Sequence, residues 1–569
     1  MKRAGSEEHA ASKHSVTAAR VLLALIRGLR AKCLMVRCYG VIEAMTTTTR
    51  MKRHPHSRGS RAVKGAVIAT AVLCLLCVTV SCDADVEHDS PPNIVLISID
   101  GLRLDRTGFG GNPRNATPNL DAFVKDAVWF PNAFSQSNES LFSHASLFTG
   151  RYPTELAHPD YLRYYLEERH VLLPEAMQAA GYETAGVFGG GHVKKSFGFD
   201  QGLDHYASTN DFGSFFTSVP LAAEWIQKGR TSPFEKPFFL FLHGYDCHRP
   251  YRHGTVFQHA FDSEYEGIMD EIIDARNETE NVVNRVWIPM TKGRALKHDN
   301  GSRILDPEAP WQLVEKVAAG HGTPLDDADL THLKAHYDTG VLTADTYLGF
   351  FFEHLHSIGL WDSTLIVIVS DHGEDLQDHG MTNHRAFLYD STTLVPMLIG
   401  GGALPKAWRG KKHDALVDAV DVTPTLTDFA GIAAPQPQRG RSLRRVLMGE
   451  EGTTAKAVFQ SGVRGHLSMR TKTHRLVYQG SQPASLDYAD RFLAAPLNTA
   501  HFELFHTEKD RGEQQNILET DLERARTMRE AMVQWYQSLE TSTVSRELDE
   551  KERKMLRDAG YWEAGEVSD

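Results

Sequence analysis

Acidic and imidazole side chains follow three apolar runs of this 569-residue sequence, at the points where the runs end. The runs and the residues after them are 93–99 before Asp100, 238–242 before His243, and 365–369 before Ser370, Asp371 and His372. Continuous apolar runs are typical of strands buried on both faces of a parallel sheet. Ligands of such sheets gather beyond the carboxyl ends of the strands. We therefore expect these side chains to converge on one catalytic site.

Helical patterns alternate with the apolar runs. Residues 174–180 begin with proline and are followed by Gly181, an arrangement that favours a short helix. Residues 337–355 have helical periodicity, and residues 422–429 form a further pattern that ends before Gly431. Alternation of strands and helices predicts a layered α/β domain with a central, mostly parallel sheet.

A Pro- and Gly-rich stretch at residues 433–440 marks a boundary. Beyond it, residues 468–470 and 475–478 have the pattern of short strands, and residues 521–539 have that of a helix. These elements predict a small C-terminal α+β subdomain. The polar, irregular segment 253–331 is interpreted either as an insertion near the mouth of the site, where substrate-selecting loops are common, or as a surface excursion.

Composition excludes some classes of function. With 41% hydrophobic and 24% charged residues, the chain is an ordinary globular protein, long enough for one large domain and a smaller one. The formal net charge of −12 gives no basis for a nucleic-acid partner. Of the six cysteines, Cys247 alone lies in the expected mature domain, so no intramolecular disulfide is expected there.

The N-terminal region has the pattern of an export signal. Residues 51–82 start with basic residues, continue through an apolar run at 66–80, and end Thr-Val-Ser-Cys at Cys82. The run is shorter than the ~20 residues of a comfortable membrane span. Cys82 stands where a bacterial lipoprotein would be cleaved and lipidated, which predicts an exported protein, periplasmic or on the cell surface, with a membrane tether at its N-terminus. An uncleaved signal anchor is the alternative.

Residues 1–50 show no targeting pattern and are interpreted as an extension from a start codon assigned too early, with Met51 as the true start. The expected segments are then 1–50 as extension, 51–82 as signal, 83–92 as linker, 93–432 as catalytic domain including the insertion 253–331, 433–545 as C-terminal subdomain and 546–569 as tail.

Residues 137–151 read Ser-Asn-Glu-Ser-Leu-Phe-Ser-His-Ala-Ser-Leu-Phe-Thr-Gly-Arg. This segment resembles the nucleophile segment of the sulfatases, in the alkaline phosphatase superfamily, whose C/S-x-P-x-R motif carries a residue that is oxidised to formylglycine. Ser140 stands at the cysteine position, Phe142 at the proline and His144 at the arginine. The chain is thus similar to a sulfatase that lacks the formylglycine motif.

Further segments carry the same resemblance in the family's order and spacing. They are 93–110, 117–121, 198–200, 243–251, 337–338, 370–380, 387–389, 421–426 and 505–516. Together they are similar to a sulfatase catalytic domain followed by its small C-terminal subdomain.

The resemblance implies one divalent metal ion. Asp100 matches the first of two metal-binding aspartates, whereas Gly101 stands where the second would be. Asp371 matches a later metal aspartate, and His372 stands where asparagine is usual. The oxygen ligands of the family suit calcium, while an imidazole favours manganese, zinc or iron. Asp100, Ser140, Asp371 and His372 would reproduce the ligand set of the phosphonate monoester hydrolases and phosphoglycerol transferases.

The resemblance also implies roles at the ester. Ser140 would be the nucleophile, because a metal contact lowers the pKa of its hydroxyl and a helix at 143–149 would supply backbone N–H groups. His248 matches the histidine that contacts the ester or protonates the leaving oxygen. The other implied residues are His144, Arg151 and His384 in catalysis, and His243, His192 and Lys194 in substrate binding.

An unmodified serine cannot expel sulfate by collapse to an aldehyde. It would form a sulfo- or phosphoserine that water or an acceptor alcohol then cleaves, a path well suited to phosphoryl transfer. The sequence therefore predicts a metal-dependent sulfatase-family hydrolase of sulfuric or of phosphoric or phosphonic esters, acting on an anionic ester of a glycan or lipid. A phosphoryl-group transferase that modifies cell-envelope glycans or lipids is one alternative, and a non-catalytic envelope binding protein is the other.

Overall fold

The computed structural model describes residues 91–156, 166–208, 212–228, 236–249, 251, 257, 260–267, 269, 326–379, 382–385, 387–450, 452–462, 465–480 and 488–540. The chain divides into two compact units, 1–84 and 85–569, and every described residue belongs to the second. The predicted extension 1–50, signal 51–82 and tail 546–569 lie outside the described residues, as does most of the linker. No described helix has the length and apolar character that a membrane crossing requires.

An eight-stranded sheet forms the centre of the described catalytic region, in the order β11-β2-β10-β7-β1-β6-β4-β5. Its strands are β11 (Lys411–Lys412), β2 (Val128–Trp129), β10 (Met397–Gly400), β7 (Thr364–Val369), β1 (Asn93–Ile99), β6 (Phe238–Gly244), β4 (Glu183–Phe188) and β5 (His205–Ser208). Strands β7, β1, β6, β4 and β5 are parallel, and β10 runs antiparallel to β7. The three predicted strands and the mostly parallel sheet are confirmed.

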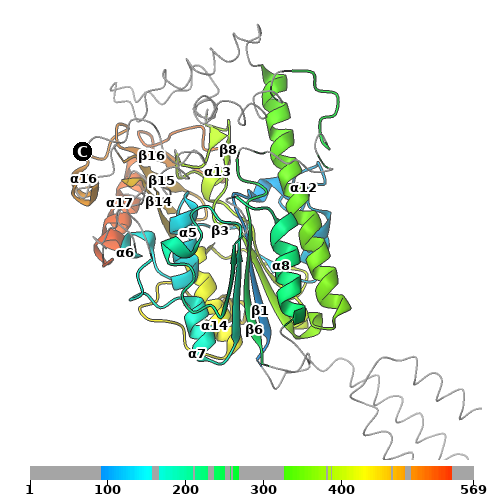
Figure 1. The fold of residues 1–569 in the computed structure, drawn as a ribbon. Coiled ribbons are helices and arrows are strands. Elements are labelled where there is room, and N and C mark those ends of the chain that lie inside the picture. Colours follow the sequence, from blue (N-terminus) through cyan, green and yellow to red (C-terminus); the bar gives the residue numbers. More distant parts are fainter. Residues whose placement is uncertain are drawn as a thin grey trace, which may run out of the picture. The chain divides into compact units, whose positions relative to one another are not determined.

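Helices cover both faces of the sheet (Figure 1). One face carries α5 (Ser140–Thr149), α7 (Leu173–Ala179) and α14 (Val422–Ala430), and the other carries α4 (Pro118–Val124), α8 (Phe215–Lys228) and α12 (Asp327–Ser357). Alternate side chains of β1 enter the two cores, with Ile94 and Leu96 on the α5 side and Val95 and Ile97 on the α12 side. This double burial explains why the strands read as continuous apolar runs.

Short elements lie between the longer ones along the chain. They are η1 (Leu104–Arg106), β3 (Ala133–Phe134), α6 (Pro153–Leu156), η3 (Lys195–Phe197), η5 (Trp361–Ser363), β8 (Asp375–Leu376), β9 (Thr382–Asn383), α13 (Asp390–Thr393), η6 (Lys406–Trp408), β12 (Val417–Asp418), η7 (Ala419–Asp421), α15 (Leu443–Leu447) and α16 (Tyr488–Ala494).

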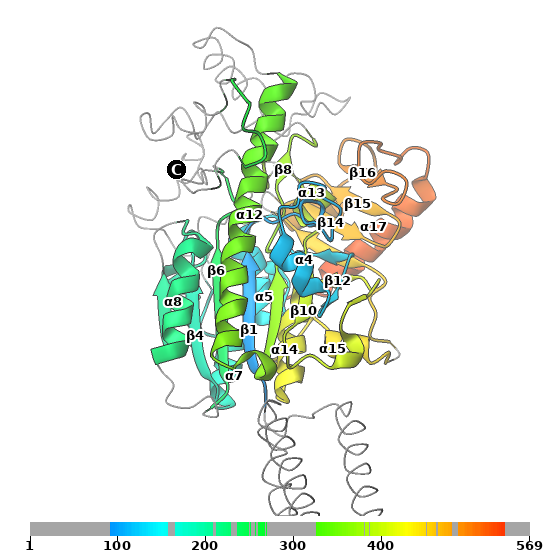
Figure 2. The same ribbon diagram turned by 90° about the vertical axis from the view of Figure 1, so that its right-hand side faces the viewer.

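The C-terminal subdomain is a four-stranded antiparallel sheet with one long helix (Figure 2). Its strands are β13 (Val458–Ser461), β14 (Leu467–Arg470), β15 (Arg475–Tyr478) and β16 (Phe502–Phe505), and α17 (Leu522–Gln537) packs on them through a separate apolar core. The predicted strands and helix of this α+β subdomain are confirmed. An ion pair between Asp390 of α13 and Arg475 of β15 joins it to the catalytic region.

Helix α12 begins earlier than the sequence pattern indicated. The side chain of Asp326 accepts hydrogen bonds from the N–H groups of Ala328 and Asp329, so the helix starts at Asp327. Residues 327–331, assigned to the insertion 253–331, are therefore the first turns of α12, and this part of the expectation was wrong. Most of the remaining insertion lies outside the described residues.

Candidate active site

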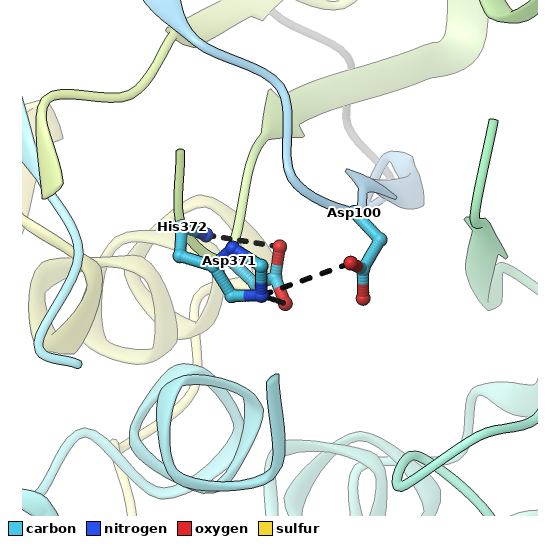
Figure 3. A group of neighbouring side chains, drawn as sticks. All are labelled: Asp100, Asp371 and His372. Atoms are coloured by element: carbon cyan, nitrogen blue, oxygen red, sulfur yellow. Dashed lines mark hydrogen bonds and ion pairs between the residues drawn. The ribbon is translucent and has the colours of Figure 1, made fainter. Parts of the chain in front are cut away.

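The register of three parallel strands brings the predicted residues to one edge of the sheet. Ser98 of β1 pairs with His243 of β6 and with Val369 of β7, so the residues after these strands are neighbours. Nε2 of His372 lies 3.3 Å from Oδ2 of Asp371 and 3.7 Å from Oδ1 of Asp100 (Figure 3). All three side chains are buried.

The carboxylates and the imidazole present unsatisfied ligand atoms to one another. Oδ1 of Asp100 and Oδ2 of Asp371 have no hydrogen-bond donor among the described residues. His372 donates its Nδ1–H to the carbonyl of Gly373 at 2.8 Å, which turns the lone pair of Nε2 toward these oxygens. Among the described residues, these three form the group whose ligand atoms all lie within 4.8 Å of one another. The donor set therefore fits a divalent cation.

The two carboxyl groups differ in pKa although both are buried. Burial and the negative charge of Asp371 raise the pKa of Asp100 well above its ordinary value. Burial also opposes ionisation of Asp371, but the imidazoles of His372, His144 and His243 outweigh it and lower the pKa of Asp371 to about 2. A cation between these groups would stabilise both carboxylates in their charged form.

Gly101 directly follows Asp100 and contacts Asp371 through its backbone. It has φ +71°, a conformation that side chains rarely adopt, and its N–H donates to Oδ1 of Asp371 at 3.1 Å. The backbone N–H of Gly101 thus helps to orient the carboxylate of Asp371.

Ser140 is the first residue of α5 and lies beside the metal-ligand group. Its Oγ is 3.1 Å from Nε2 of His372, and its side chain is fully buried. The helix begins at Ser140, three residues before the predicted start, and ends at Gly150, which has φ 67°. The N–H groups of the first turn and the helix dipole therefore favour an anion next to Ser140.

His144 lies behind Ser140 and uses both ring nitrogens within the protein. Nδ1–H donates to the carbonyl of Ser140 at 2.7 Å, and Nε2 accepts from the hydroxyl of Ser98 at 2.9 Å. Nδ1 is also 3.5 Å from Oδ2 of Asp371. The imidazole thus links α5 to β1.

Two further imidazoles lie on the other side of His372. The ring of His384 stacks on that of His372 with centroids 4.0 Å apart, and the ring of His248 lies 5.3 Å from that of His384. His248 donates Nδ1–H to the carbonyl of Arg249, and His384 donates to that of Asn138, so Nε2 is the nitrogen that can exchange a proton. Burial, and next the charge of His372, lower the pKa of both rings well below the usual value.

His243 supports Asp100 from β6. Its Nδ1 accepts the N–H of Gly189 at 3.4 Å, which leaves Nε2–H to face Oδ2 of Asp100, also at 3.4 Å. A histidine that donates to a carboxylate ligand fixes the orientation of that ligand.

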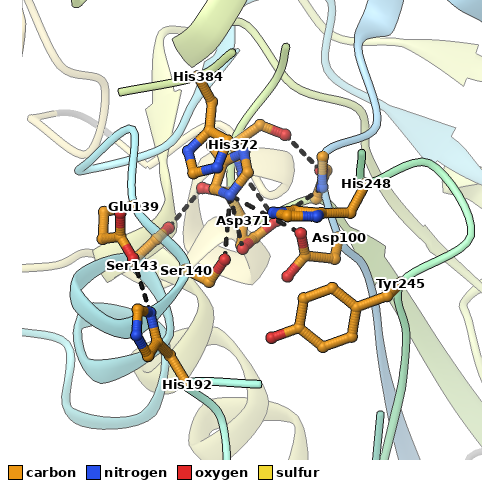
Figure 4. A network of polar contacts seen from close by, with 12 residues as sticks. Asp100, Glu139, Ser140, Ser143, His192, Tyr245, His248, Asp371, His372 and His384 are labelled. Carbon is orange, nitrogen blue, oxygen red and sulfur yellow. Dashed lines mark hydrogen bonds and ion pairs between the residues drawn. The ribbon is translucent and has the colours of Figure 1, made fainter. Parts of the chain in front are cut away.

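His192 belongs to a charged cluster on the opposite side of Ser140 from His248 (Figure 4). Nδ1 of His192 is 2.8 Å from Oε1 of Glu139, and Nε of Arg385 is 3.0 Å from Oε2. Burial opposes ionisation of Glu139, but Arg385 and His192 prevail and lower its pKa. Lys194 is half-buried near this cluster, where its charge contributes to lowering the pKa of His192.

Arg151 is not brought to the site. It follows the C-terminal end of the ten-residue helix α5, about 15 Å from its start at the usual helical rise. Its guanidinium lies 3.5 Å from the carboxylate of Glu155 and 3.3 Å from Nδ1 of His170. The expectation that Arg151 belongs to the catalytic residues as a support of the nucleophile loop is therefore corrected, because helix α5 separates it from Ser140.

Sequence reasoning missed two charged residues of the site, Glu139 and Arg385, and a buried carboxyl group nearby in the chain, that of Glu374. Glu139 directly precedes the proposed nucleophile and Arg385 directly follows His384, and these positions were the available signal. Glu374 lies two residues after His372 and is fully buried. Burial raises the pKa of Glu374 to about 8, against the opposing charge of Arg249.

Comparisons with known proteins find similar sequences and folds among sulfatases and phosphonate monoester hydrolases. Curated relatives include an N-acetylglucosamine-6-O-sulfatase of Bacteroides thetaiotaomicron, 25% identical over 69% of this chain and 79% of its own. A structure solved in complex with D-glucosamine-2-N,6-O-disulfate has a TM-score of 0.59 and 20% identity, over 79% of this chain and 98% of that one. The phosphonate monoester hydrolase of Agrobacterium radiobacter has a TM-score of 0.55 and 18% identity, over 79% and 95%.

Family models match nearly the whole described region. The C-terminal model described as N-sulphoglucosamine sulphohydrolase, C-terminal, matches residues 377–539. The sulfatase model matches residues 92–432, which contain the sheet and every ligand atom described above. With its strand-end carboxylates, its buried helix-terminal serine and this match, the chain belongs to the sulfatase family.

Proposed function

We propose that this sulfatase-family hydrolase cleaves an anionic sulfuric, phosphoric or phosphonic ester with Ser140 as its nucleophile. The observation that carries the proposal is the position of Ser140 Oγ, 3.1 Å from Nε2 of His372 and at the N-terminus of α5. An ordinary loop serine would have no reason to be fully buried beside two carboxylates and an imidazole.

Asp100, Asp371 and His372, together with Ser140, would hold the metal ion. A divalent cation bound there would lower the pKa of the Ser140 hydroxyl and offset the negative charge of the ester. The three oxygen ligands suit calcium, and the imidazole adds affinity for manganese, zinc or iron.

The ionised oxygen of Ser140 attacks the sulfur or phosphorus atom, and the bond from that atom to the leaving alcohol breaks. Burial lowers the pKa of His248 in the free protein, but a bound anionic ester would favour the protonated ring, whose Nε2–H then gives its proton to the leaving oxygen. Water then attacks the serine ester, the bond to Oγ of Ser140 breaks, and His248 accepts a proton from that water. His144, which holds the carbonyl of Ser140, positions the nucleophile.

Charges around Ser140 complete the binding site for the ester. Arg385 and Arg249 supply positive charge, and His384, His192 and Lys194 are further candidates for contact with the ester oxygens. The relatives named above, which include a sulfatase of an amino sugar and a phosphonate monoester hydrolase, support both ester classes. We favour phosphoric or phosphonic esters. An unmodified serine forms a covalent intermediate that is released when water attacks its sulfur or phosphorus atom, and phosphoryl transfer is well suited to this two-step path.

The location of the substrate follows from the N-terminal sequence. The export signal at residues 51–82 and its terminal Cys82 would place the domain outside the cytoplasm, tethered to a membrane. A glycan or lipid of the cell envelope would be within reach there.

The test compares wild type with Ser140→Ala after reconstitution with metal. Substrates are 4-nitrophenyl sulfate, 4-nitrophenyl phosphate, a phosphodiester and a phosphonate monoester. We expect loss of at least about a thousandfold in kcat for Ser140→Ala, because the covalent path is lost. Ser146→Ala, also buried in α5, is the matched control and should keep its activity. Undiminished turnover by Ser140→Ala would rule out this nucleophile, and turnover of the sulfate alone would rule out the phosphoryl preference.

A further inference from the structure

Two buried histidines face each other on α12, apart from the residues of the proposed active site. His332 and His336 are four residues apart, the spacing that places two side chains on one face of a helix. Their Nε2 atoms are 3.0 Å apart, and both side chains are nearly inaccessible to solvent. Two histidines at this helical spacing are a recognised pair of zinc ligands in proteins.

A carboxylate fixes the orientation of one of the two rings. Nδ1 of His332 lies 3.1 Å from Oδ2 of Asp262, and a carboxylate can only accept, so Nδ1 carries the proton. The other ring nitrogen of His332, Nε2, is therefore the one that faces His336. A carboxylate behind a histidine is the usual outer partner of a metal-ligating imidazole, because it sets the tautomer and increases the basicity of the ligand.

An aromatic ring holds the same histidine from the side. The ring of Tyr265 stacks on that of His332, with centroids 3.7 Å apart and an angle of 11°. The hydroxyl of Tyr265 donates to the carboxylate of Asp329, one turn earlier on α12. The histidine pair is thus fixed by partners from residues 262–265 as well as from its own helix.

We propose that His332 and His336 bind a second divalent transition metal, of the zinc, nickel or copper class. Two nitrogens at Zn–N distances of about 2.0–2.1 Å are about 3.3 Å apart in a tetrahedral site, a few tenths of an ångström more than the observed spacing. Imidazole nitrogen suits these metals rather than calcium or magnesium. Water would fill the remaining positions, since no third ligand atom of the described residues joins the pair.

The position of the pair indicates what the second metal does. His336 directly precedes Tyr337, whose hydroxyl donates to the carbonyl of Gly101 and accepts the N–H of Arg103. Metal at the pair would join Asp262 and its neighbours to the start of α12, the helix that holds the loop after Asp100. The second metal is therefore a structural clamp and takes no part in the reaction itself.

The experiment counts zinc ions bound by the tag-free full chain. Metal-free protein is dialysed against zinc, and bound zinc is measured by elemental analysis. We expect His336→Gln to bind one equivalent fewer than wild type. His354→Gln is the matched control, since it lies on the same helix with no histidine four residues away, and it should bind as many as wild type. Equal zinc binding by wild type and His336→Gln would overturn the proposal and leave only a hydrogen bond between the two rings.

Two further variants separate this site from the active site and from a folding defect. Asp262→Asn should retain the fold, shown by its circular dichroism, and bind the second zinc about 10- to 100-fold more weakly. His372→Ala should lose the zinc ion bound at the active site and keep the zinc ion bound by His332 and His336. An unchanged zinc affinity in Asp262→Asn, or loss of all zinc in His372→Ala, would contradict a separate site.

Discussion

Histidine side chains form much of this site, and hydrogen bonds to backbone carbonyl groups fix the orientation of their rings. His248, His372 and His384 each donate Nδ1–H to a backbone carbonyl, so each presents Nε2 to its surroundings. Fixing the tautomer in advance removes a rotation and a proton shift from the reaction. The proton donor for the leaving oxygen should therefore be identifiable from one substitution.

Replacing His248 by asparagine should slow the enzyme in a way that depends on the leaving group. Loss of a general acid costs about 10²–10⁴-fold in rate. We expect that loss with an alkyl ester, whose alkoxide needs a proton, and a much smaller one with the 4-nitrophenyl ester. The measurement is kcat/KM for both esters in wild type and His248→Asn. Equal losses on the two esters would show that His248 binds the substrate but does not protonate it.

His384→Asn is the companion variant for this measurement. His384 stacks on His372 and so contributes to binding and to the orientation of the ligand ring. Its substitution should lower kcat/KM for both esters alike. A selective loss on the alkyl ester would move the role of acid from His248 to His384.

At the scale of elements, a buried ion network fastens the C-terminal sheet to the catalytic region. Asp390 of α13 pairs with Arg475 of β15 and lies 3.2 Å from Arg470 of β14. Glu513 lies 2.7 Å from the guanidinium of Arg475 on its other side. Burial opposes ionisation of Asp390, but the two arginines prevail and lower its pKa to about 2.

This lowered pKa predicts how stability depends on pH. Because the pKa of Asp390 is lower in the folded protein than in the unfolded chain, its contribution is complete above about pH 4 and is lost as pH falls toward about 2. Asp390→Asn should lower the free energy of unfolding by about 2 kcal/mol at pH 6. The difference from wild type should shrink as pH falls from 4 toward 2, measured by urea unfolding.

The matched control is Asp428→Asn, which breaks the more exposed ion pair between Asp428 and Arg444. An exposed pair of this kind contributes about 0–1 kcal/mol. A difference between Asp390→Asn and wild type that stays constant down to pH 2 would contradict the assignment of the acid-sensitive contribution to Asp390.

The elements show what the sequence could and could not predict. Strands β1, β6 and β7 were readable because burial on both faces leaves continuous apolar runs, and their register then determines which residues meet. The pairing of Glu139 with His192 and Arg385 was not readable, because it joins loops far apart in the chain. The start of α12 was missed because its first turns are polar, and the capping role of Asp326 is clear only in three dimensions.

For the molecule as a whole, the metal should contribute to stability as well as to chemistry. Two buried carboxylates, Asp100 and Asp371, lie next to each other with unsatisfied oxygens. A ligand that binds only the folded state at a hundred times its Kd stabilises it by about 2.7 kcal/mol. We therefore expect wild type to melt at a lower temperature after chelation and to recover on addition of manganese.

Asp100→Asn tests the origin of this effect. Removing this carboxylate should abolish the response to manganese, while the chelated variant should be at least as stable as chelated wild type, since burial and the charge of Asp371 both oppose ionisation of Asp100. Thermal unfolding followed by circular dichroism gives both comparisons. A full response to manganese in Asp100→Asn would exclude Asp100 from the metal site.

Ser140 at the head of α5 has a consequence for how the protein can be made. If its plain hydroxyl is the nucleophile, no partner enzyme need convert the side chain of Ser140 before the protein can act. Protein produced in a host without a sulfatase-maturing enzyme should then be fully competent, with a peptide containing Ser140 at its encoded mass. Activity per molecule should also stay constant however strongly the gene is expressed, because no maturation step can become saturated.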